Sequence, residues 1–335
     1  MHKIVESTWP TMATTQMISS RPAESSRFRA PNTSHLDRVA YLVGTPISHS
    51  QSPVLHHAIY SSLGKRWGQV LAETDDLAGF IRYLKSDLKS MGSGVTMPFK
   101  VAVIPYLDEL TEAGHAVGAI NTIFYRYGPD GQRRYVGTNT DVLGIQDAFL
   151  NHVEGAPYKG KPGLVIGGGG TCRAAVYALR NLLGCSPIYI VNREQSEVES
   201  VMSEYTSRGA GVDLIHVATV RQAESLTPPS IAVSAVPDFA PTSLNEQVAR
   251  DVIKTFLRGR DGASSLLEMC YHPSPDTAIS RLAIEAGWQV IGGVEAMIGQ
   301  GLAQASLWTG IEIDDSLRDR VSSRVKHGQA QKHKL

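Results

Sequence analysis

The stretch Val165–Ala175 reads V-I-G-G-G-G-T-C-R-A-A and passes from apolar residues through four glycines into small residues. Branched apolar residues before a glycine run favour a strand that ends in a tight turn, and the alanines favour a helix packed closely on that strand. In such a strand–turn–helix unit, the free N–H groups at the start of the helix bind phosphate groups. The stretch therefore predicts a dinucleotide-binding turn within a βαβ unit.

The match to the standard fingerprint G-x-G-x-x-G/A is incomplete. Gly167 and Gly169 occupy its first two glycine positions, but Cys172 stands at the third. The first glycine permits the tight turn, and the second lets the backbone approach a pyrophosphate. Small residues follow directly, so close packing of the helix on the strand is still expected. We predict that this turn binds a nucleotide rather than serving only as a connection.

Apolar runs recur on both sides of this turn at the spacing of βαβ units. They lie at 163–166, 188–191, 231–235, 265–269 and 289–291. Short apolar runs that alternate with helix-length segments predict an α/β fold with a parallel sheet. We therefore expect a dinucleotide-binding domain of the Rossmann type over residues 147–292.

The N-terminal half contains polar stretches, each just after a short apolar run. They are Gly44–Pro53 (G-T-P-I-S-H-S-Q-S-P), Gly94–Lys100 (G-V-T-M-P-F-K), Gly118–Thr122 (G-A-I-N-T) and Gly137–Asp141 (G-T-N-T-D). Together they supply hydroxyls, amides, one amine and one carboxylate. Such a set is typical of a site for a small polyhydroxylated acid held by many hydrogen bonds.

In this order, the motifs resemble those of the shikimate/quinate dehydrogenase family. The matching pieces are G-x-P-I-x-H-S-x-S-P, V-T-x-P-x-K, G-A-x-N-T, N-T-D, the glycine turn with R-A after it, and Y-x-P at Tyr271. The resemblance extends from about Val39 to Gly310. The chain departs from the common family pattern at Gly94, Ser234, Glu268 and Ala296. With these departures it most resembles fungal single-domain quinate dehydrogenase-like members.

The resemblance implies a role for each matched residue. Lys100 and Asp141 would form the catalytic pair, and Ser50 and Ser52 would bind the substrate carboxylate. Thr96, Asn121 and Gln300 would hold the hydroxyls of the substrate, with Tyr271 over the substrate side of the cleft. The residues implied for the cofactor are Gly167, Gly169, Gly170, Thr171, Asn192, Arg193, Glu194 and Gly293.

These roles agree with the chemistry of alcohol oxidation. The reaction requires a hydride acceptor, which a nicotinamide provides, and a group that takes the hydroxyl proton. A lysine can take that proton if burial lowers its pKa toward neutrality, and a neighbouring aspartate can orient the amine. We expect reversible oxidation of shikimate or quinate to the 3-dehydro acid; the residues alone do not separate the two substrates.

The cofactor is expected to be NAD or NADP, with NAD favoured. Asn192-Arg193 follows the strand at which such folds read the adenosine ribose, and Arg193 could stack on adenine or meet a 2′-phosphate. Glu194 and Glu197 follow, and their negative charge disfavours that phosphate. Glu194 could also accept a hydrogen bond from the ribose 2′-hydroxyl.

Composition narrows the class of protein. The 335 residues include 42% hydrophobic and 19% charged residues, enough apolar residues for a core and few enough charges for a folded chain. Lysine plus arginine equals aspartate plus glutamate, 32 against 32, so no net charge attracts nucleic acid or an anionic membrane. The three cysteines are too scattered for a zinc site, and no metal is expected.

Two tails flank the expected folded region. Residues 1–38 are rich in Ser, Thr, Pro and Arg and lack apolar periodicity, so a disordered tail is expected. Arginines among serines resemble a mitochondrial presequence, but Glu6 and Glu24 oppose it, and a cytoplasmic location is expected. Residues 321–335 are expected to be a basic, solvated tail.

The expected architecture has two α/β domains with a cleft between them. Residues 39–146 and 293–320 would form the substrate domain, because Gln300 must reach the substrate. The enzyme would be a monomer or a homodimer. The alternative is a non-catalytic protein of the same fold that senses the acid and regulates transcription, which predicts loss of the Lys100–Asp141 pair or of the glycine turn. Another Rossmann dehydrogenase with a different substrate is disfavoured by Ser50, Ser52 and Lys100.

Overall fold

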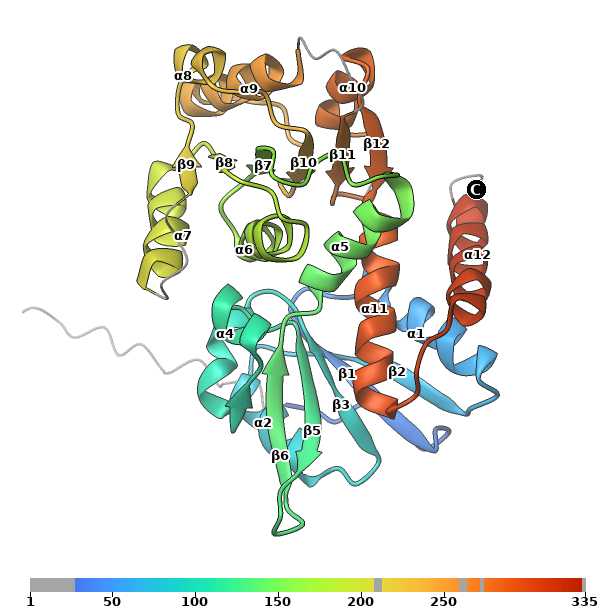
Figure 1. Cartoon of the computed structure of the whole chain (residues 1–335). Coiled ribbons are helices and arrows are strands. Elements are labelled where there is room, and N and C mark those ends of the chain that lie inside the picture. The colour runs from blue at the N-terminus through green and yellow to red at the C-terminus, as the bar shows by residue number, and fades with distance from the viewer. Residues whose placement is uncertain (1–27, 208–212, 259–263, 272–273, 333–335) are drawn as a thin grey trace, which may run out of the picture.

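A computed structural model describes residues 28–207, 213–258, 264–271 and 274–332 of the chain. The described chain forms two α/β domains, each built on a six-stranded sheet (Figure 1). The prediction of a two-domain α/β fold is confirmed. Among the described residues, no helix combines the length and the apolar character that a membrane crossing requires.

The first sheet is mixed. Its strands are β1 (Arg38–Gly44), β2 (Trp67–Glu73), β3 (Ser90–Val95), β4 (Glu109–Leu110), β5 (Thr122–Tyr127) and β6 (Arg133–Thr138). The strand order is β2-β1-β3-β5-β6-β4, and β5 is antiparallel to both of its neighbours. The helices of this part are α1 (Ser52–Ser62), α2 (Leu77–Ser86), α3 (Phe99–Ala102) and α4 (Glu112–Val117), with a 3-10 turn at Ile104–Tyr106.

The second sheet is parallel throughout. Its strands are β7 (Gly163–Ile166), β8 (Ile188–Val191), β9 (Leu214–His216), β10 (Ile231–Ser234), β11 (Ser265–Glu268) and β12 (Gln289–Gly292). The five apolar runs of the sequence coincide with β7, β8, β10, β11 and β12. The order β12-β11-β10-β7-β8-β9 reverses direction between β7 and β10. In parallel sheets, ligands bind beside such a reversal, outside the carboxyl ends of the strands.

Helices cover this parallel sheet. They are α6 (Gly170–Tyr177), continued by a π-helical turn at Ala178–Leu182, α7 (Gln195–Ser207), α8 (Val220–Ser225), α9 (Leu244–Leu257) and α10 (Ala278–Glu285). The strands are buried along their whole length at the centre of the sheet, as expected for a sheet covered on both faces.

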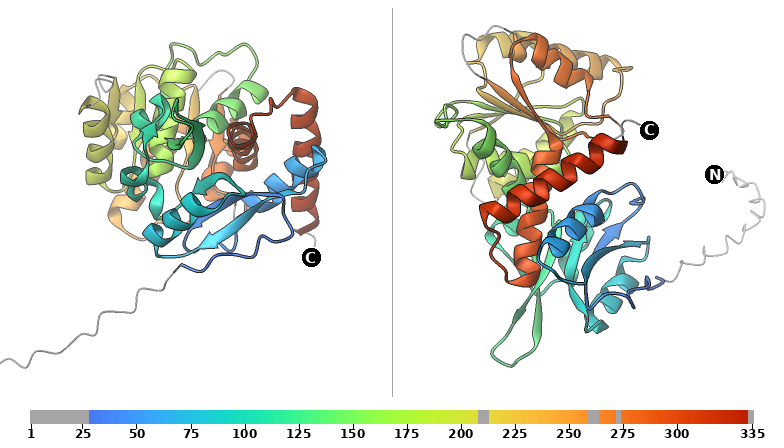
Figure 2. Two further views of the ribbon diagram at one scale, coloured as in Figure 1. Left: turned by 90° about the horizontal axis from the view of Figure 1, so that it is seen from below. Right: turned by 90° about the vertical axis from the view of Figure 1, so that its right-hand side faces the viewer.

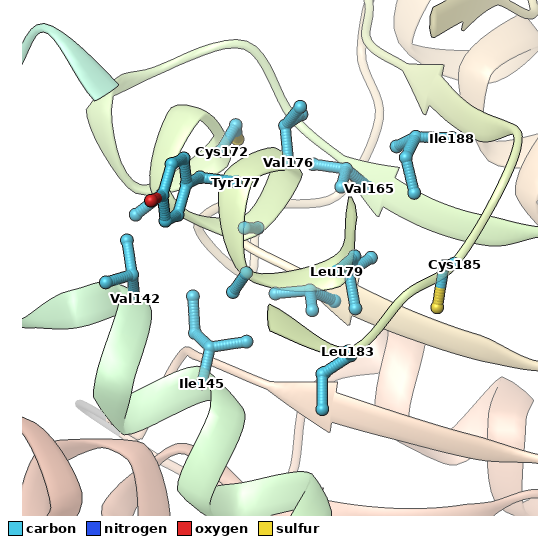
Figure 3. Packing of buried hydrophobic residues seen from close by; sticks show 14 of the residues in the cluster. Val142, Ile145, Val165, Cys172, Val176, Tyr177, Leu179, Leu183, Cys185 and Ile188 are labelled. Carbon is cyan, nitrogen blue, oxygen red and sulfur yellow. The ribbon is translucent and has the colours of Figure 1, made fainter. Parts of the chain in front are cut away.

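Two helices join the domains: α5 (Asp141–His152) and α11 (Gly293–Thr309). They cross at Gly144, where a β-carbon would lie only 2.2 Å from the carbonyl oxygen of Ala296. On its other side, α5 presents Val142 and Ile145 toward α6 (Figure 3). The predicted domain boundary after residue 146 is wrong in this respect, because it cuts a continuous helix that packs on both domains.

The predicted C-terminal tail is also wrong in part. Residues Asp315–Lys332 form the helix α12, which runs beside α1 and α11 across the junction of the domains (Figure 2). Leu317, Val321 and Val325 are buried against those helices. Their spacing of four residues places them on one face of a helix. Arg324 and Lys326, which contributed to the expectation of a solvated tail, are exposed.

The predicted N-terminal tail is too long. Of residues 1–38, the first 27 lie outside the described residues. The ring of Phe28 packs against Phe80 and Tyr83 of α2, with ring centroids 5.5 and 5.2 Å away. Leu36 packs in the same cluster, and β1 begins at Arg38. Residues 28–38 therefore belong to the folded domain, because their apolar side chains contribute to its core.

Candidate active site

A cavity of about 390 Å³ lies between the two domains. All eight residues predicted to be catalytic or substrate-binding line it, although they come from six separate parts of the chain. They are Ser50, Ser52, Thr96, Lys100, Asn121, Asp141, Tyr271 and Gln300. Thr171 and Gly293, predicted to bind the cofactor, line this cavity as well. The volume suits a small organic acid together with one end of a larger ligand.

The two ionisable residues of the predicted catalytic pair form an ion pair. Lys100 Nζ donates to Asp141 Oδ2 over 2.7 Å, and the two side chains are 19% and 14% exposed. Lys100 lies in the short helix α3, whose carbonyl at that residue accepts from Ile120 N at 2.7 Å. This backbone bond ties the lysine segment to the residues just before β5, where Asn121 lies.

Asn121 binds the other oxygen of the Asp141 carboxylate. Its Nδ2 donates to Asp141 Oδ1 over 2.8 Å. Its Oδ1 accepts from the backbone N–H of Thr140 and from Thr122 Oγ1, each at 2.7 Å. Because those donors occupy the carbonyl oxygen, the amide nitrogen must face the aspartate. Each carboxylate oxygen therefore has its own donor, which fixes the plane of the carboxylate.

The N-T-D stretch owes its shape to its own side chains. Asn139 is buried; its Nδ2 donates to Ala119 O at 2.7 Å, and its Oδ1 accepts from Asp141 N at 3.0 Å. Thr140 Oγ1 donates to Gln300 Oε1 of α11 at 3.3 Å. Asp141 then starts α5, where the positive end of the helix dipole favours its negative charge.

The predicted carboxylate-binding serines lie before and at the start of α1. Ser50 Oγ accepts from Ser52 N at 3.2 Å, so the two hydroxyls share one turn. Behind them, His56 Nδ1 lies 2.9 Å from Ser52 O and 3.4 Å from Ser52 Oγ. The His56 ring is completely buried, and this burial lowers its pKa to about 4. A neutral imidazole therefore contacts Ser52 and helps to hold the serine turn in place.

Tyr271 also lines the cavity. Burial raises the pKa of its phenol, and the negative charge of Asp141 raises it further. The segment before it is held by the buried Glu268, which accepts from Thr277 Oγ1 at 2.7 Å and from Cys270 N at 3.0 Å. Burial raises the pKa of Glu268 as well. The histidine and proline of the Y-x-P motif, residues 272 and 273, lie outside the described residues.

A second cavity of about 390 Å³ lies at the carboxyl ends of β7, β8 and β10. Gly168, Gly169, Asn192 and Arg193 line it, at the reversal of strand order. The glycine turn separates the two cavities, since Gly169 faces this one and Thr171 faces the other. At Gly170 a β-carbon would lie 3.9 Å from Lys100 Cδ, so the turn lies next to the side chain of Lys100.

The glycine turn has the geometry that a bound pyrophosphate requires. Gly167 has φ +126°, where a side chain would be strained, and its β-carbon would lie 2.5 Å from Cys172 Sγ. Gly169 has open space above it, where a phosphate could approach the start of α6. Cys172 is buried beneath the turn, and burial raises its thiol pKa to about 12. The residues present therefore fit a dinucleotide.

Not all of the predicted cofactor residues face the second cavity. Gly167 and Gly170 shape the turn without lining it, and Glu194 is not among its lining residues. Two carboxylates line this cavity, those of Glu197 and Glu246, and Glu197 accepts from Asn192 Nδ2 at 2.7 Å. The role of Glu194 in binding the cofactor therefore stays a prediction. Glu197 lies three residues further along, on the first turn of α7, and that turn directs it back over Gly168.

Other lining residues were not anticipated. His49 and Gln304 line the substrate-side cavity, and Phe239, Glu246 and Arg250 line the second cavity. His49 and the Q-x-x-x-Q spacing of Gln300 and Gln304 on one helix face were visible in the sequence. The position of Glu246 opposite Arg193 was not. Among the described residues, no group of three or more His, Cys, Asp or Glu side chains is arranged to hold a metal ion.

A parallel sheet with a phosphate-binding glycine turn, facing a Lys–Asp pair across a cleft, defines a two-domain oxidoreductase of the Rossmann class. Comparison with known proteins narrows this class. A family model described as the shikimate dehydrogenase substrate binding domain matches residues 42–123. The quinate dehydrogenase of Emericella nidulans is 42% identical over an aligned length of 319 residues, and the match covers 89% of this chain and 96% of that protein. The chain belongs to the shikimate/quinate dehydrogenase family.

Other relatives agree with this assignment. The pentafunctional AROM polypeptide of Komagataella phaffii is 38% identical over 281 residues; the match spans 17% of that much longer protein. The solved dehydroquinate dehydratase and shikimate dehydrogenase from S. pombe AroM has a TM-score of 0.73 and 33% identity, over 86% of this chain and 53% of that one. Shikimate dehydrogenase of Mycobacterium tuberculosis has a TM-score of 0.69 and 27% identity, over 87% and 99%.

Proposed function

We propose that this protein catalyses the reversible oxidation of quinate, and less efficiently of shikimate, to the 3-dehydro acid. The Lys100–Asp141 ion pair, which lies in the cavity between the domains and beside the glycine turn, carries this proposal. The alternative of a non-catalytic sensor predicts that the pair or the turn is lost, and both are present. Quinate is placed first because the similarity to the Emericella nidulans quinate dehydrogenase extends over nearly the whole of both chains.

Different residues of the cavity bind the carboxylate and the hydroxyls of the acid. The hydroxyls of Ser50 and Ser52 donate to the carboxylate of the acid. Thr96, Asn121 and Gln300 hydrogen-bond its ring hydroxyls and so place one of them at Lys100. A hydroxyl bound in this way replaces the water that would otherwise solvate the Lys100 ammonium.

Lys100 transfers the proton. In the direction of reduction, its ammonium donates a proton to the oxygen of the ketone; in the direction of oxidation, the amine takes the proton of the hydroxyl. Asp141 holds the amine through Oδ2, and Asn121 keeps the carboxylate in that plane. The nicotinamide ring of the cofactor supplies or accepts the hydride.

The cofactor side supports a nicotinamide dinucleotide. The glycine turn offers backbone N–H groups to the pyrophosphate, and the second cavity offers space for the adenosine half. A solved shikimate dehydrogenase of Thermus thermophilus, 26% identical with a TM-score of 0.66, was determined in complex with NADP(H) and shikimate. For this chain we propose a preference for NAD, because the carboxyl group of Glu197 lies beside Asn192, where a 2′-phosphate would bring further oxygen acceptors and negative charge.

Initial rates with quinate and shikimate, each with NAD and NADP, test the proposal. We expect the highest kcat/KM for quinate with NAD. A purified protein that turns over neither acid with either cofactor would show that the proposal is wrong. A higher kcat/KM for shikimate than for quinate would refute the substrate preference alone.

A further inference from the structure

Arg193 and Glu246 face each other across the second cavity. Arg193 follows β8, and Glu246 lies in the first turn of α9, after β10. The guanidinium of Arg193 donates to Glu246 Oε1, although 53 residues separate the two in sequence. Both line the cavity, with 54% and 20% of their side chains exposed. The ion pair therefore spans the crevice at the reversal of strand order, where the adenosine half of a dinucleotide binds.

Glu246 is the immobile partner of this pair. Its Oε2 accepts from the backbone N–H groups of Thr242 and Ser243, each at 2.9 Å. Ser243 Oγ in turn accepts from Glu246 N at 3.2 Å, which completes a capping box at the start of α9. These donors, with Arg193, lower the pKa of Glu246 to about 2. The carboxylate stays ionised at neutral pH, with Oε1 directed at Arg193.

Four charged side chains line the cavity: Arg193, Glu197, Glu246 and Arg250. Glu246 pairs with Arg193, and Asn192 donates to Glu197. Arg193 is the cation that directly follows the ribose-reading strand. A 2′-phosphate at this place could gain Arg193 only by displacing a fixed carboxylate, and it would then lie beside two negative groups.

We infer that Glu246 determines the cofactor preference of the enzyme by holding Arg193 away from the 2′ position of the adenosine ribose. The inference deepens the proposed function and rests on its dinucleotide site. An unphosphorylated ribose needs no cation, so NAD binds with the ion pair intact. NADP binds only after the pair opens. Glu246 is thus a positioning residue that acts through Arg193.

The test is the ratio of the Kd values for NADP and NAD, measured by calorimetry on the wild type, Glu246→Gln, Arg193→Ala and the double variant. In Glu246→Gln the released Arg193 should bind the 2′-phosphate and shift the ratio toward NADP by about tenfold, the size of one exposed charge-assisted contact. In the Arg193→Ala background, the same substitution should shift the ratio much less, because only the repulsion between Glu246 and the phosphate is removed. Glu224→Gln, an exposed change on α8, controls for the altered net charge.

Two results would overturn the inference. One is a ratio in Glu246→Gln within twofold of the wild type; the other is an equal shift when Arg193 is absent. If loss of the helix cap prevents Glu246→Gln from folding, the Kd values of Arg193→Ala alone test the inference. In the wild type, Glu246 keeps Arg193 from the phosphate, so Arg193→Ala should bind NADP as tightly as the wild type does. A selective loss of NADP affinity in this variant would show that Glu246 does not hold Arg193 away from the phosphate.

The inference and the proposed function can fail separately. A wild type that binds dinucleotides but oxidises neither quinate nor shikimate removes the proposed function, and the Kd ratios still test Glu246. A wild type that binds neither dinucleotide overturns both.

Discussion

The Asp141 carboxylate receives one donor on each of its oxygens, Lys100 on Oδ2 and Asn121 on Oδ1. An ammonium group has three N–H donors. Within the described part of the chain, Lys100 Nζ hydrogen-bonds to Asp141 alone. The remaining donors can meet a hydroxyl or ketone oxygen of a bound acid. This arrangement of single residues is what makes proton transfer in the cavity feasible.

His56 makes stability depend on pH. Its folded pKa of about 4 lies below the ordinary value of 6.5, because burial excludes the charged form. Above pH 6.5 both folded and unfolded chains hold a neutral imidazole. As the pH falls from 6.5 toward 4, only the unfolded chain takes up the proton, so the free energy of unfolding falls by up to roughly 3 kcal/mol.

Denaturant unfolding between pH 7 and 4.5 checks this expectation. The side chains around the ring are Ser52, Gln69, Tyr60 and Trp308. None of them titrates in this range, so the difference in slope between the wild type and a variant without His56 belongs to the histidine. His56→Gln should lose stability less steeply than the wild type as the pH falls, whereas His57→Gln, an exposed change on the same helix, should keep the wild-type slope. Equal slopes in all three proteins would contradict the burial argument.

The sequence was sufficient to find the residues that carry local motifs. Lys100, Asp141, Asn121 and the serines stand in stretches whose polarity has no use in packing, and the structure brings them to one cavity. The contacts of Arg193 could not be predicted. The S-x-x-E spacing at Ser243 signals a helix start, but its glutamate meets a residue on another strand, and that distance depends on the whole sheet.

At the scale of helices, the close crossing of α5 and α11 positions Gln300. Gly144→Ala would gain up to about 1 kcal/mol from helix propensity. Its β-carbon, however, would lie 2.2 Å from the backbone oxygen of Ala296 and 3.0 Å from Gln300 Cβ. A backbone atom cannot move aside alone, and overpacking of this kind costs about 1–3 kcal/mol. The variant should therefore be less stable and bind the acid more weakly.

Thermal unfolding and KM for quinate measure the two effects of Gly144→Ala. Gly292→Ala is the matched control, since a β-carbon there meets nothing within 4 Å. We expect a lower Tm and a raised KM for Gly144→Ala and neither change for the control. An unchanged Tm and KM in both variants would show that the helix crossing tolerates a methyl group and does not position Gln300.

Strands were easier to predict than helix ends. The strands of the parallel sheet are short, apolar and bounded by glycines or polar residues, so their positions follow from composition. Helix α12 was missed because, among its described side chains, Leu317, Val321 and Val325 alone form the buried apolar face, and its charges dominate the local pattern. Its stability depends on α1 and α11, which lie far away in sequence.

At the scale of the molecule, the candidate active site lies where the two domains meet. Lys100 and Asp141 come from the first domain and from the joining helix α5, whereas Thr171 and Tyr271 come from the parallel-sheet side. Helix α12 is attached to this junction by two ion pairs. Arg318 pairs with Asp147 of α5 at 2.8 Å, and Lys326 pairs with Glu295 of α11 at 2.7 Å. Exposed ion pairs contribute little, about 0–1 kcal/mol each, so the buried face of α12 supplies most of its attachment.

The central claim is that Lys100 transfers a proton to and from the acid held between the domains. The most direct measurement is kcat for quinate oxidation by Lys100→Ala, beside the wild type and Lys161→Ala, an exposed lysine of the other domain. With Tm unchanged, kcat should fall by about two to four orders of magnitude, the usual contribution of a general acid–base group, and Lys161→Ala should retain wild-type turnover. Turnover by Lys100→Ala within a factor of a few of the wild type would contradict the account.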